Sequence, residues 1–298
     1  MSNPSLPSGT GLERLLEGIE ISQYEDFYQA LPRDVGEELG IEVRREGRRL
    51  RLTAAGYDHP MFNRIMGIGL NAESGGDDPE TVLGRAAEHY ESVGVRRWMI
   101  QVLPHVEPEG FAETAGRHGI IRLRGWAKHL GSADQENRSR SELKIVRLGT
   151  EGSAGEGGDA SLVVDAWAEI LVQNFGFPDP FLAWLRALRT RERWHLYLAL
   201  DGDTPVATGA LFLSGSDAGP IGQLTFGSTL PEYRGRGAQS ALVARRVEDA
   251  RAAGARWVVS ETDEELAERP NPSTRNLVRL GLPVAYVRAN WGPPKPDE

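Results

Sequence analysis

The residues whose types and spacing are most suited to binding or catalysis lie in a short basic segment of the C-terminal half. Arg234, Gly235, Arg236 and Gly237 follow an apolar run and a proline, and they open a segment with the periodicity of an amphipathic helix. The N–H groups at the start of a helix lack partners within the helix, and the helix dipole adds positive potential there. Glycine lets the backbone approach a ligand closely, and arginine keeps its charge at physiological pH. The segment therefore predicts an anion site, with a pyrophosphate as the natural occupant.

A dinucleotide-binding fingerprint is the nearest alternative for this segment. Gly235 and Gly237 have the spacing of its first two glycines, and Glu261 lies at a suitable distance for a ribose contact. However, Ser240 occupies the third glycine position, and the strand-like runs before the loop follow one another without intervening helices. These features disfavour a Rossmann domain, and they leave a nucleotide-dependent oxidoreductase as the alternative with the least support.

The elements that would position this loop follow from apolar periodicity and turn residues. In the C-terminal half we expect strands at 142–148, 195–200, 205–213, 221–230, 256–261 and 282–290, with helices at 161–175, 180–188, 237–253 and 271–280. The strands at 221–230 and 256–261 should be parallel neighbours connected through the helix at 237–253. They should splay apart, and splayed strands leave backbone groups free to bond a ligand.

The N-terminal half has a similar order of elements. We expect a helix from Leu12, strands at 41–45, 50–55, 63–70, 97–103 and 121–130, and a helix from Asp78 to Val93. The long helix of each half ends in a Gly-x-Arg boundary, at Gly94 and at Gly254. We therefore predict an internal duplication with domains at 1–131 and 142–298, joined by a polar linker at 132–141. The expected fold class is α/β (α+β), a mixed, mostly antiparallel sheet flanked by helices, in two similar domains.

The loop of the first half that corresponds to the basic segment is acidic. Glu73, Asp77, Asp78 and Glu80 would repel a pyrophosphate. We therefore expect ordinary cofactor binding in the C-terminal half alone, with the first half supporting the fold or one wall of an acceptor site.

Composition excludes several classes of function. The chain has 298 residues and no cysteine, which excludes disulfides, Cys-ligated zinc and a thiol nucleophile. Its net charge of -9 argues against general nucleic-acid binding, and no run approaches the roughly 20 apolar residues that span a bilayer. The six histidines lack metal-ligand spacing, and no G-x-S-x-G motif occurs. We expect a cytoplasmic protein with no metal, no nucleic-acid partner and no membrane association, and the sequence leaves a homodimer open.

The segment P-E-Y-R-G-R-G-A-Q-S-A-L, at 231–242, resembles the acetyl-CoA loop of the GNAT (GCN5-related N-acetyltransferase) acyltransferases. That loop has the pattern (Arg/Gln)-x-x-Gly-x-(Gly/Ala), and Arg234 and Gly237 match its first two fixed positions. Gln239 departs from the third, so its side chain must point away from the pyrophosphate. The segment 271–282 also resembles the family. The resemblance covers about 142–291 well and the first half by element order.

The resemblance implies acetyl-CoA, or another acyl-CoA, as co-substrate and the amine of a small molecule as acceptor. It implies that the backbone at the end of one strand binds the pantetheine arm, that the loop N–H groups hold the pyrophosphate, and that the start of the last helix lies near the thioester. The cofactor-binding residues would be Thr229, Leu230, Arg234, Gly235, Arg236, Gly237, Ala238, Gln239, Ser240, Asn271 and Ser273. For Asn271, helix capping is an equally good explanation.

The sequence does not identify the general acid or the general base. In many relatives a tyrosine four residues before the glycine of the last helix is the general acid, but counting back from Gly281 gives Leu277. The strand at 222–230 also lacks the carboxylate that sometimes serves as base. Substitute candidates are Tyr286 and Tyr233 for the acid and Glu261 and Asp263 for the base. A non-catalytic acyl-CoA sensor is therefore the alternative to an acetyltransferase.

Overall fold

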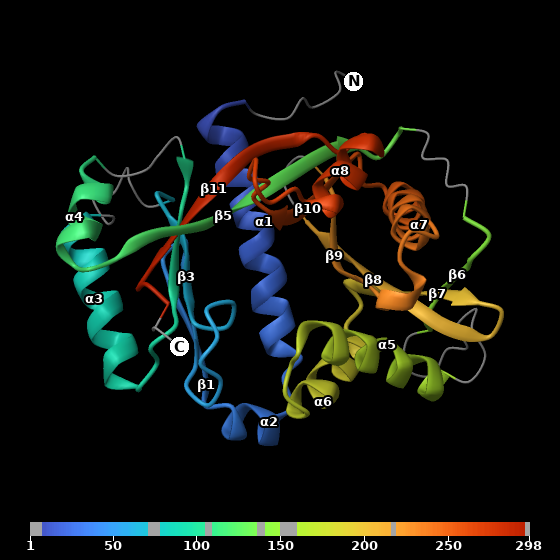
Figure 1. The fold of residues 1–298 in the computed structure, drawn as a ribbon, viewed down its shortest axis with the longest axis horizontal. Coiled ribbons are helices and arrows are strands. Elements are labelled where there is room, and N and C mark those ends of the chain that lie inside the picture. The colour runs from blue at the N-terminus through green and yellow to red at the C-terminus, as the bar shows by residue number, and fades with distance from the viewer. Residues whose placement is uncertain are drawn as a thin grey trace. The chain divides into compact units, whose positions relative to one another are not determined.

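A computed structural model describes residues 8–70, 78–104, 109–135, 141–149, 160–215 and 219–295 of the chain. It has two compact units (Figure 1). Unit 1 comprises Met1–Tyr28, Gly36–Ala127 and Tyr286–Glu298, and unit 2 comprises Gln29–Val35 and Lys128–Ala285. The chain therefore passes from one unit to the other inside two of its strands, β5 and β11.

Unit 1 is built on a sheet in which β1, β2 and β3 are antiparallel, β3 and β4 are parallel, and β4 pairs antiparallel with β11. Helix α3 connects the parallel pair, and its N-terminus is capped by Asp78, as the Asp-Pro signal predicts. Side chains of α3 and α4 form an apolar core with β4 residues such as Ile100 and Val102. The elements are α1 (Thr10–Gln29), α2 (Arg33–Glu38), β1 (Ile41–Glu46), β2 (Arg49–Ala54), β3 (Arg64–Ile68), α3 (Pro79–Ser92), β4 (Met99–Val102), α4 (Phe111–Arg117), β5 (Ile121–Ser132) and β11 (Val284–Gly292).

Unit 2 is an antiparallel meander of β6, β7, β8 and β9, followed by β10 parallel to β9. Helix α7 connects β9 to β10, and it packs with α8 on a core that includes Leu211, Val247 and Leu277. The elements are β6 (Lys144–Arg147), α5 (Ala160–Phe175), α6 (Pro180–Ala187), η3 (Leu188–Thr190), β7 (Trp194–Asp201), β8 (Thr204–Ser214), β9 (Ile221–Thr229), η4 (Pro231–Tyr233), α7 (Ala238–Ala252), β10 (Trp257–Asp263) and α8 (Pro272–Arg279).

The predicted fold class is confirmed, and so is the parallel pairing of β9 with β10. Both units contain an antiparallel pair, then a parallel pair connected through one long helix, which supports the proposed duplication. The compact units do not follow the proposed domain ranges 1–131 and 142–298, because unit 2 takes Gln29–Val35 and Lys128–Ala285, and unit 1 takes Tyr286–Glu298. Ser132, placed in the linker 132–141, is the last residue of β5, and residues 136–140 lie outside the described chain. The internal duplication, with domains at 1–131 and 142–298, therefore stays a prediction.

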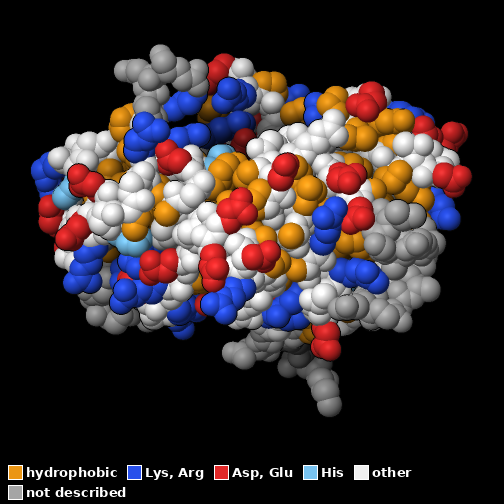
Figure 2. Space-filling model, turned by 90° about the horizontal axis from the view of Figure 1, so that it is seen from below, with side chains coloured by type: hydrophobic (Ala, Val, Ile, Leu, Met, Phe, Trp, Pro, Cys, Tyr) orange, Lys and Arg blue, Asp and Glu red, His pale blue; other side chains and the backbone are white. Residues whose placement is uncertain are grey.

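The described surface carries both signs of charge. On the face drawn in Figure 2, acidic and basic side chains are interspersed with apolar ones. No helix in the described ranges combines the length and the apolar character needed to cross a membrane.

In unit 2, His195 of β7 is half-buried, and its buried Nδ1 has no hydrogen-bond partner among the described residues. Burial, and then the charge of Arg147, lower the pKa of His195 to about 4. The unfolded chain binds a proton at this ring below its ordinary pKa of about 6.5, while the folded chain resists protonation until about pH 4. Stability should therefore fall as the pH drops through this window. The unfolding free energy should fall less between pH 7 and pH 4.5 in His195→Gln than in the wild type, by about 1 kcal/mol, as measured by urea unfolding. An equal fall in both proteins would show that His195 does not cause the loss.

Candidate functional site

The basic loop predicted from the sequence lies between β9 and α7 of unit 2. After the short turn η4, Gly235 and Gly237 adopt positive φ angles of 79° and 80°, a region that favours glycine. Gly237 is the N-cap of α7, and no side chain caps the helix there. The residue types therefore produce the geometry that the sequence predicts, a glycine-built entry into a helix whose N-terminus is open.

The N–H groups of this loop divide into two sets. Those of Tyr233 and Arg234 close the turn by donating to the carbonyls of Leu230 and Pro231. Those of residues 235–240 donate to no acceptor among the described residues. Six consecutive N–H groups at the positive end of a helix dipole form a donor array suited to a phosphate or pyrophosphate.

The side chains of the two arginines in the loop have different partners. Arg236 forms a two-pronged ion pair with Asp201, with distances of 2.7 and 2.9 Å. Hydrogen bonding in this pair raises the pKa of Arg236 and lowers that of Asp201. Arg234 makes a weak contact of 3.4 Å from Nε to the carbonyl of Thr229 and is exposed. Arg234 is therefore the side chain with the freedom to reach a phosphate, whereas Arg236 offers its backbone N–H.

Gln239, which departs from the family pattern, turns its side chain toward the strands, as predicted. Its Nε2 donates to the carbonyl of Ser228 at 2.8 Å, to Oγ1 of Thr229 at 3.1 Å and to the carbonyl of Thr208 at 3.3 Å. A Cβ at Gly227 would lie 2.9 Å from Oε1 of Gln239, so a larger residue there would displace this side chain. The side chain of Gln239 thus clamps the first turn of α7 to β8 and β9.

This clamp predicts the effect of an isosteric change. In Gln239→Glu a carboxylate without donors would face the carbonyls of Ser228 and Thr208. We expect a loss of about 2–3 kcal/mol in unfolding free energy, more than for Gln239→Ala, which leaves the carbonyls unpaired but adds no repulsion. Urea unfolding measures both variants, and a smaller cost for Gln239→Glu than for Gln239→Ala would contradict the clamp.

Strand β9 carries a bulge next to the loop. The register with β8 shifts between Thr208 and Ala210, so that Gly209 lies opposite the extra length of β9. Phe226 in this bulge has a φ of 51°, the one positive φ of a non-glycine residue in the described chain. The hydroxyl of Thr208 donates to the carbonyl of Phe226 at 2.9 Å, which helps to hold this conformation. Bulges of this kind redirect backbone groups and are common next to active sites.

The other side of the bulge is held by a buried arginine of α7. Nη1 of Arg246 donates to the carbonyls of Thr225 at 3.0 Å and Ala210 at 3.1 Å. Burial lowers the pKa of Arg246 to about 10. Gly209 leaves room for the guanidinium, because a Cβ there would lie 2.8 Å from its Cζ. The sequence signal for this contact is Arg246 itself, a charge on the otherwise apolar face of α7.

The parallel pairing of β9 and β10 is short. Paired residues run from Trp257 with Ile221 to Ser260 with Leu224, where the Ser260 hydroxyl bonds the Leu224 carbonyl at 3.0 Å. Both strands continue beyond this point, and the described residues show no further pairing between them. The pairing of β9 with β10 therefore ends before β9 reaches the loop, which agrees with the predicted separation of the two strands.

Thr229 and Leu230, predicted to bond the pantetheine arm, lie at the end of β9. The N–H of Leu230 donates to Val206 at 3.0 Å and its carbonyl accepts from Tyr233 at 3.0 Å. Leu230 therefore anchors the turn. Its carbonyl already accepts one hydrogen bond, from Tyr233, so a ligand would donate to the second lone pair of this carbonyl. Thr229 pairs with Ala207 of β8 and accepts the contacts from Gln239 and Arg234 described above.

Asn271 is the N-cap of α8. Its Oδ1 accepts from the N–H of Ser273 at 3.0 Å, and its Nδ2 donates to the carbonyl of Asp263 at 2.7 Å. Capping and the link to β10 use both ends of the amide, so the side chain has a structural role. Ser240 of α7 bonds Oδ1 of Asn276 at 2.9 Å, which connects α7 to α8.

The catalytic candidates have defined partners. Glu261 at the end of β10 forms an ion pair of 2.8 Å with Lys128, whose side chain is 3% exposed. Tyr286 belongs to unit 1, where its hydroxyl donates to Glu17 at 2.8 Å and burial, then the charge of Glu17, raise its pKa well above the ordinary value. A phenol held in this way is a weaker acid, which favours a structural role for Tyr286. Tyr233 packs against the unit 2 core with the guanidinium of Arg236 above its ring at 5.5 Å.

Three polar contacts of two side chains, near the end of β10 and at the bulge, could not be predicted from the sequence. His129 is buried, with Nδ1 against the carbonyl of Leu282 at 2.9 Å and Nε2 against the hydroxyl of Thr262 at 3.1 Å. Asn174 of α5 donates to the hydroxyl of Ser228 at 2.7 Å. All three contacts join residues far apart in the chain, so no local spacing indicates them.

Part of the chain is similar in sequence to a known protein family. Residues 164–270 match the model of the Acetyltransferase (GNAT) family, a range that contains the loop and most of unit 2. No curated protein sequence matches the chain.

Solved structures share the fold across most of the chain. A GCN5-related N-acetyltransferase from Kribbella flavida has a TM-score of 0.62 at 13% identity, covering 96% of this chain and 97% of the other. A functionally unknown conserved protein from Staphylococcus epidermidis has a TM-score of 0.56 at 10% identity, covering 88% of this chain and 98% of the other. A GCN5-related N-acetyltransferase from Sphaerobacter thermophilus has a TM-score of 0.53 at 18% identity, covering 76% and 70%. At these identities the likeness establishes the acyl-CoA N-acyltransferase fold.

Proposed function

Because residues 164–270 form a domain of the GNAT acetyltransferase family, we propose that this protein transfers an acetyl group from acetyl-CoA to the amine of a small molecule. The observation that carries the proposal is the open N-terminus of α7. Gly237 leaves this helix without a side-chain cap, and the N–H groups of residues 235–240 form the array that a pyrophosphate requires. Arg234 adds an exposed positive charge beside it.

The rest of unit 2 supports this proposal. The short β9–β10 pairing leaves backbone groups of β9 beyond Leu224 for a pantetheine arm, and the bulge at Phe226 redirects them. In the proposed reaction the neutral amine attacks the thioester carbonyl, the C–S bond breaks, and CoA leaves as a thiolate. The proton that the attacking nitrogen loses on forming the amide balances the proton that converts the thiolate to the thiol. The ammonium must first lose a proton, and Glu261, in its ion pair with Lys128, is the proposed acceptor, directly or through water.

The two units should differ in cofactor binding. In unit 1 the carboxylate of Asp78 accepts from the N–H of Thr81 at 2.9 Å and so occupies the N-terminus of α3. Glu80 adds a second carboxylate in the first turn, while Glu73 and Asp77 lie outside the described residues. We therefore expect calorimetry to give one acetyl-CoA per chain. Two equivalent sites would contradict the proposal, and stabilisation by NAD(P)H without stabilisation by acetyl-CoA would favour the oxidoreductase alternative.

A non-catalytic acyl-CoA sensor is the second candidate. It is favoured by the setting of Tyr286, whose hydroxyl is engaged by Glu17, and by the absence of a carboxylate from β9. Thiol release from acetyl-CoA, measured with a library of small amines, separates the two. Amine-dependent release that falls at least tenfold in Glu261→Gln supports the enzyme with Glu261 as base. Binding of acetyl-CoA without release by any amine supports the sensor.

A further inference from the structure

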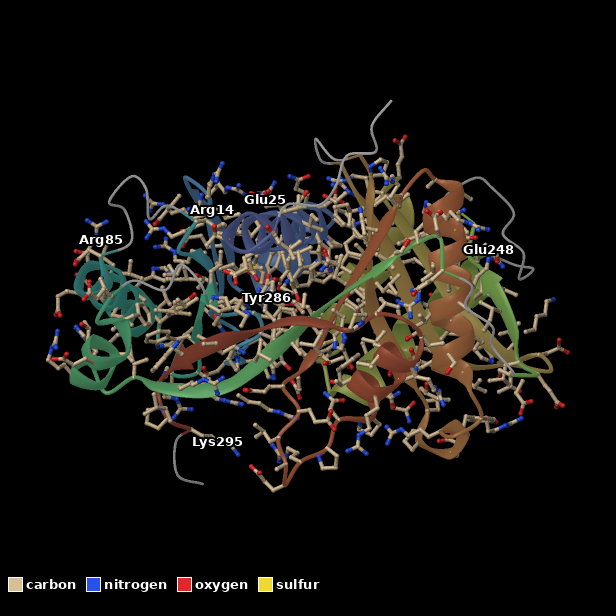
Figure 3. All side chains as sticks on the ribbon, turned by 90° about the horizontal axis from the view of Figure 1, so that it is seen from above. Arg14, Glu25, Arg85, Glu248, Tyr286 and Lys295 are labelled. Carbon is tan, nitrogen blue, oxygen red and sulfur yellow. The ribbon has the colours of Figure 1, made fainter. Side chains whose placement is uncertain are left out.

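The two faces of the unit 1 sheet differ in chemistry. One face carries the apolar core under α3 and α4. The other contains Arg64 of β3, Gln101 of β4, and Arg288 and Asn290 of β11, and each of these four side chains is at most 1% exposed. Helix α1 contributes Glu17 and Glu20 to the same cluster, again fully buried. Figure 3 marks Tyr286 on β11 and Arg14 and Glu25 on α1, the two elements that contribute most of the cluster.

Most of this buried polar cluster is internally bonded. Arg288 donates to Glu17 at 2.5 Å and to both carboxylate oxygens of Glu20. Nε2 of Gln101 donates to Asn290 at 3.2 Å, and Asn290 donates to the carbonyl of Arg124 at 2.8 Å. These bonds account for the burial of Arg288 and Asn290 in terms of the fold alone.

Arg64 is different. Its side chain is 0% exposed, and none of its three nitrogens donates a hydrogen bond to any described residue. The nearest carboxylate oxygen is that of Glu20, at 3.9 Å. The guanidinium lies over the ring of Tyr24 at 3.9 Å and near that of Trp126 at 5.0 Å, so a flat face is covered while the N–H edges keep their capacity. A buried guanidinium with unused donors is costly, so its presence needs an explanation, and a ligand that accepts these hydrogen bonds would supply one.

A second unused group has the opposite polarity. Oε1 of Gln101 is buried and accepts no hydrogen bond among the described residues. Arg64 pairs with Met99 in the β3–β4 register, so Gln101 lies two positions further along the same face of β4. One unused donor set and one unused acceptor thus lie on the same face of neighbouring strands.

We propose that unit 1 binds a small amino acid at this cluster, with its carboxylate on the N–H edge of Arg64 and its ammonium on Oε1 of Gln101. Guanidinium groups bind carboxylates in a two-pronged, in-plane geometry, and the Arg64 edge suits it. Helix α1 buries Glu13 and Asp26 as well as Glu17 and Glu20, so this region already holds several carboxylates. A zwitterion adds no net charge to it, whereas a simple carboxylate adds a negative one. Tyr24 and Trp126, whose rings lie over the guanidinium of Arg64, are half-buried, and we place the entry of the ligand on their side of the cluster. This site is independent of the proposed acetyl transfer.

The test is a thermal-shift series on the full chain. Each standard amino acid is added in turn at constant ionic strength, with acetate as the probe that lacks the ammonium and acetamide as the uncharged probe. We expect at least one small amino acid to raise Tm by several degrees at saturation, and acetate and acetamide to raise it much less. If no amino acid stabilises the protein, or if acetate does so equally well, the proposal is wrong.

Variants locate the effect. Arg64→Gln should weaken amino-acid binding at least tenfold in calorimetry. Without ligand it should lower Tm much less than Arg288→Met does, because the Arg64 side chain donates no hydrogen bond to the described residues. Gly237→Asp should bind the amino acid as the wild type does, which separates this site from the loop of unit 2. Unchanged affinity in Arg64→Gln would overturn the assignment. So would destabilisation equal to that of Arg288→Met, which would make Arg64 a purely structural residue.

Discussion

Gly237→Asp is expected to abolish acetyl-CoA binding, with at least a hundredfold loss of affinity in calorimetry and no loss of the fold. The carboxylate would lie at the N-terminus of α7, where it would accept from the first-turn N–H groups and repel the pyrophosphate. The nearest atom to a new Cβ is that of Ser141 at 3.2 Å, so the side chain fits with small adjustment. Asp78 shows the same arrangement at the N-terminus of α3, where the carboxylate bonds Thr81.

The control for backbone strain is Gly254→Asp. Gly254 has a φ of 85°, close to the 80° of Gly237, and no atom lies within 4 Å of a Cβ built there. Both variants therefore place a non-glycine residue at positive φ, at a cost of roughly 1 kcal/mol. Only Gly237→Asp changes the anion site. Equal effects of the two variants on affinity, or wild-type affinity in folded Gly237→Asp, would remove the loop from the proposed function.

Much of this site could be predicted because its signals are local. Positive φ angles at Gly235 and Gly237, the open N-terminus of α7 and the cap at Asn271 each follow from residue types within a few positions. The strands of the meander also appear within about two residues of their expected bounds, since short apolar runs between turn residues define them.

What the sequence could not indicate depends on contacts between distant residues. The bulge at Phe226 needs the Thr208 hydroxyl and the Arg246 guanidinium, which come from β8 and α7. The apolar stripe of α1 predicted a helix, yet the structure also buries Glu17 and Glu20 on it. Acidic residues on a helix normally mark its solvent face. Their actual partner, Arg288, is 271 positions away from Glu17, so no periodicity could connect them.

That partner gives the largest expected effect on stability. Arg288→Met should lower the unfolding free energy of unit 1 by about 3–5 kcal/mol, because Glu17 and Glu20 would be left as buried carboxylates without their hydrogen-bonded cation. Arg64 cannot replace it, since its nearest approach to Glu20 is 3.9 Å without a hydrogen bond. Urea unfolding, followed by circular dichroism and by tryptophan fluorescence, measures the change.

The control adds Glu17→Gln and Glu20→Gln to Arg288→Met. Neutral amides remove both uncompensated charges, so we expect the triple variant to recover a substantial part of the lost stability, because the cost comes from the unpaired charges more than from lost packing. Arg275→Met, whose side chain is 68% exposed in its ion pair with Glu265, should change stability by less than about 1 kcal/mol. If Arg288→Met behaved like Arg275→Met, the buried cluster would contribute no more than a surface ion pair. If the triple variant were less stable than Arg288→Met alone, the loss would come from packing, and the electrostatic account of this face of unit 1 would fail.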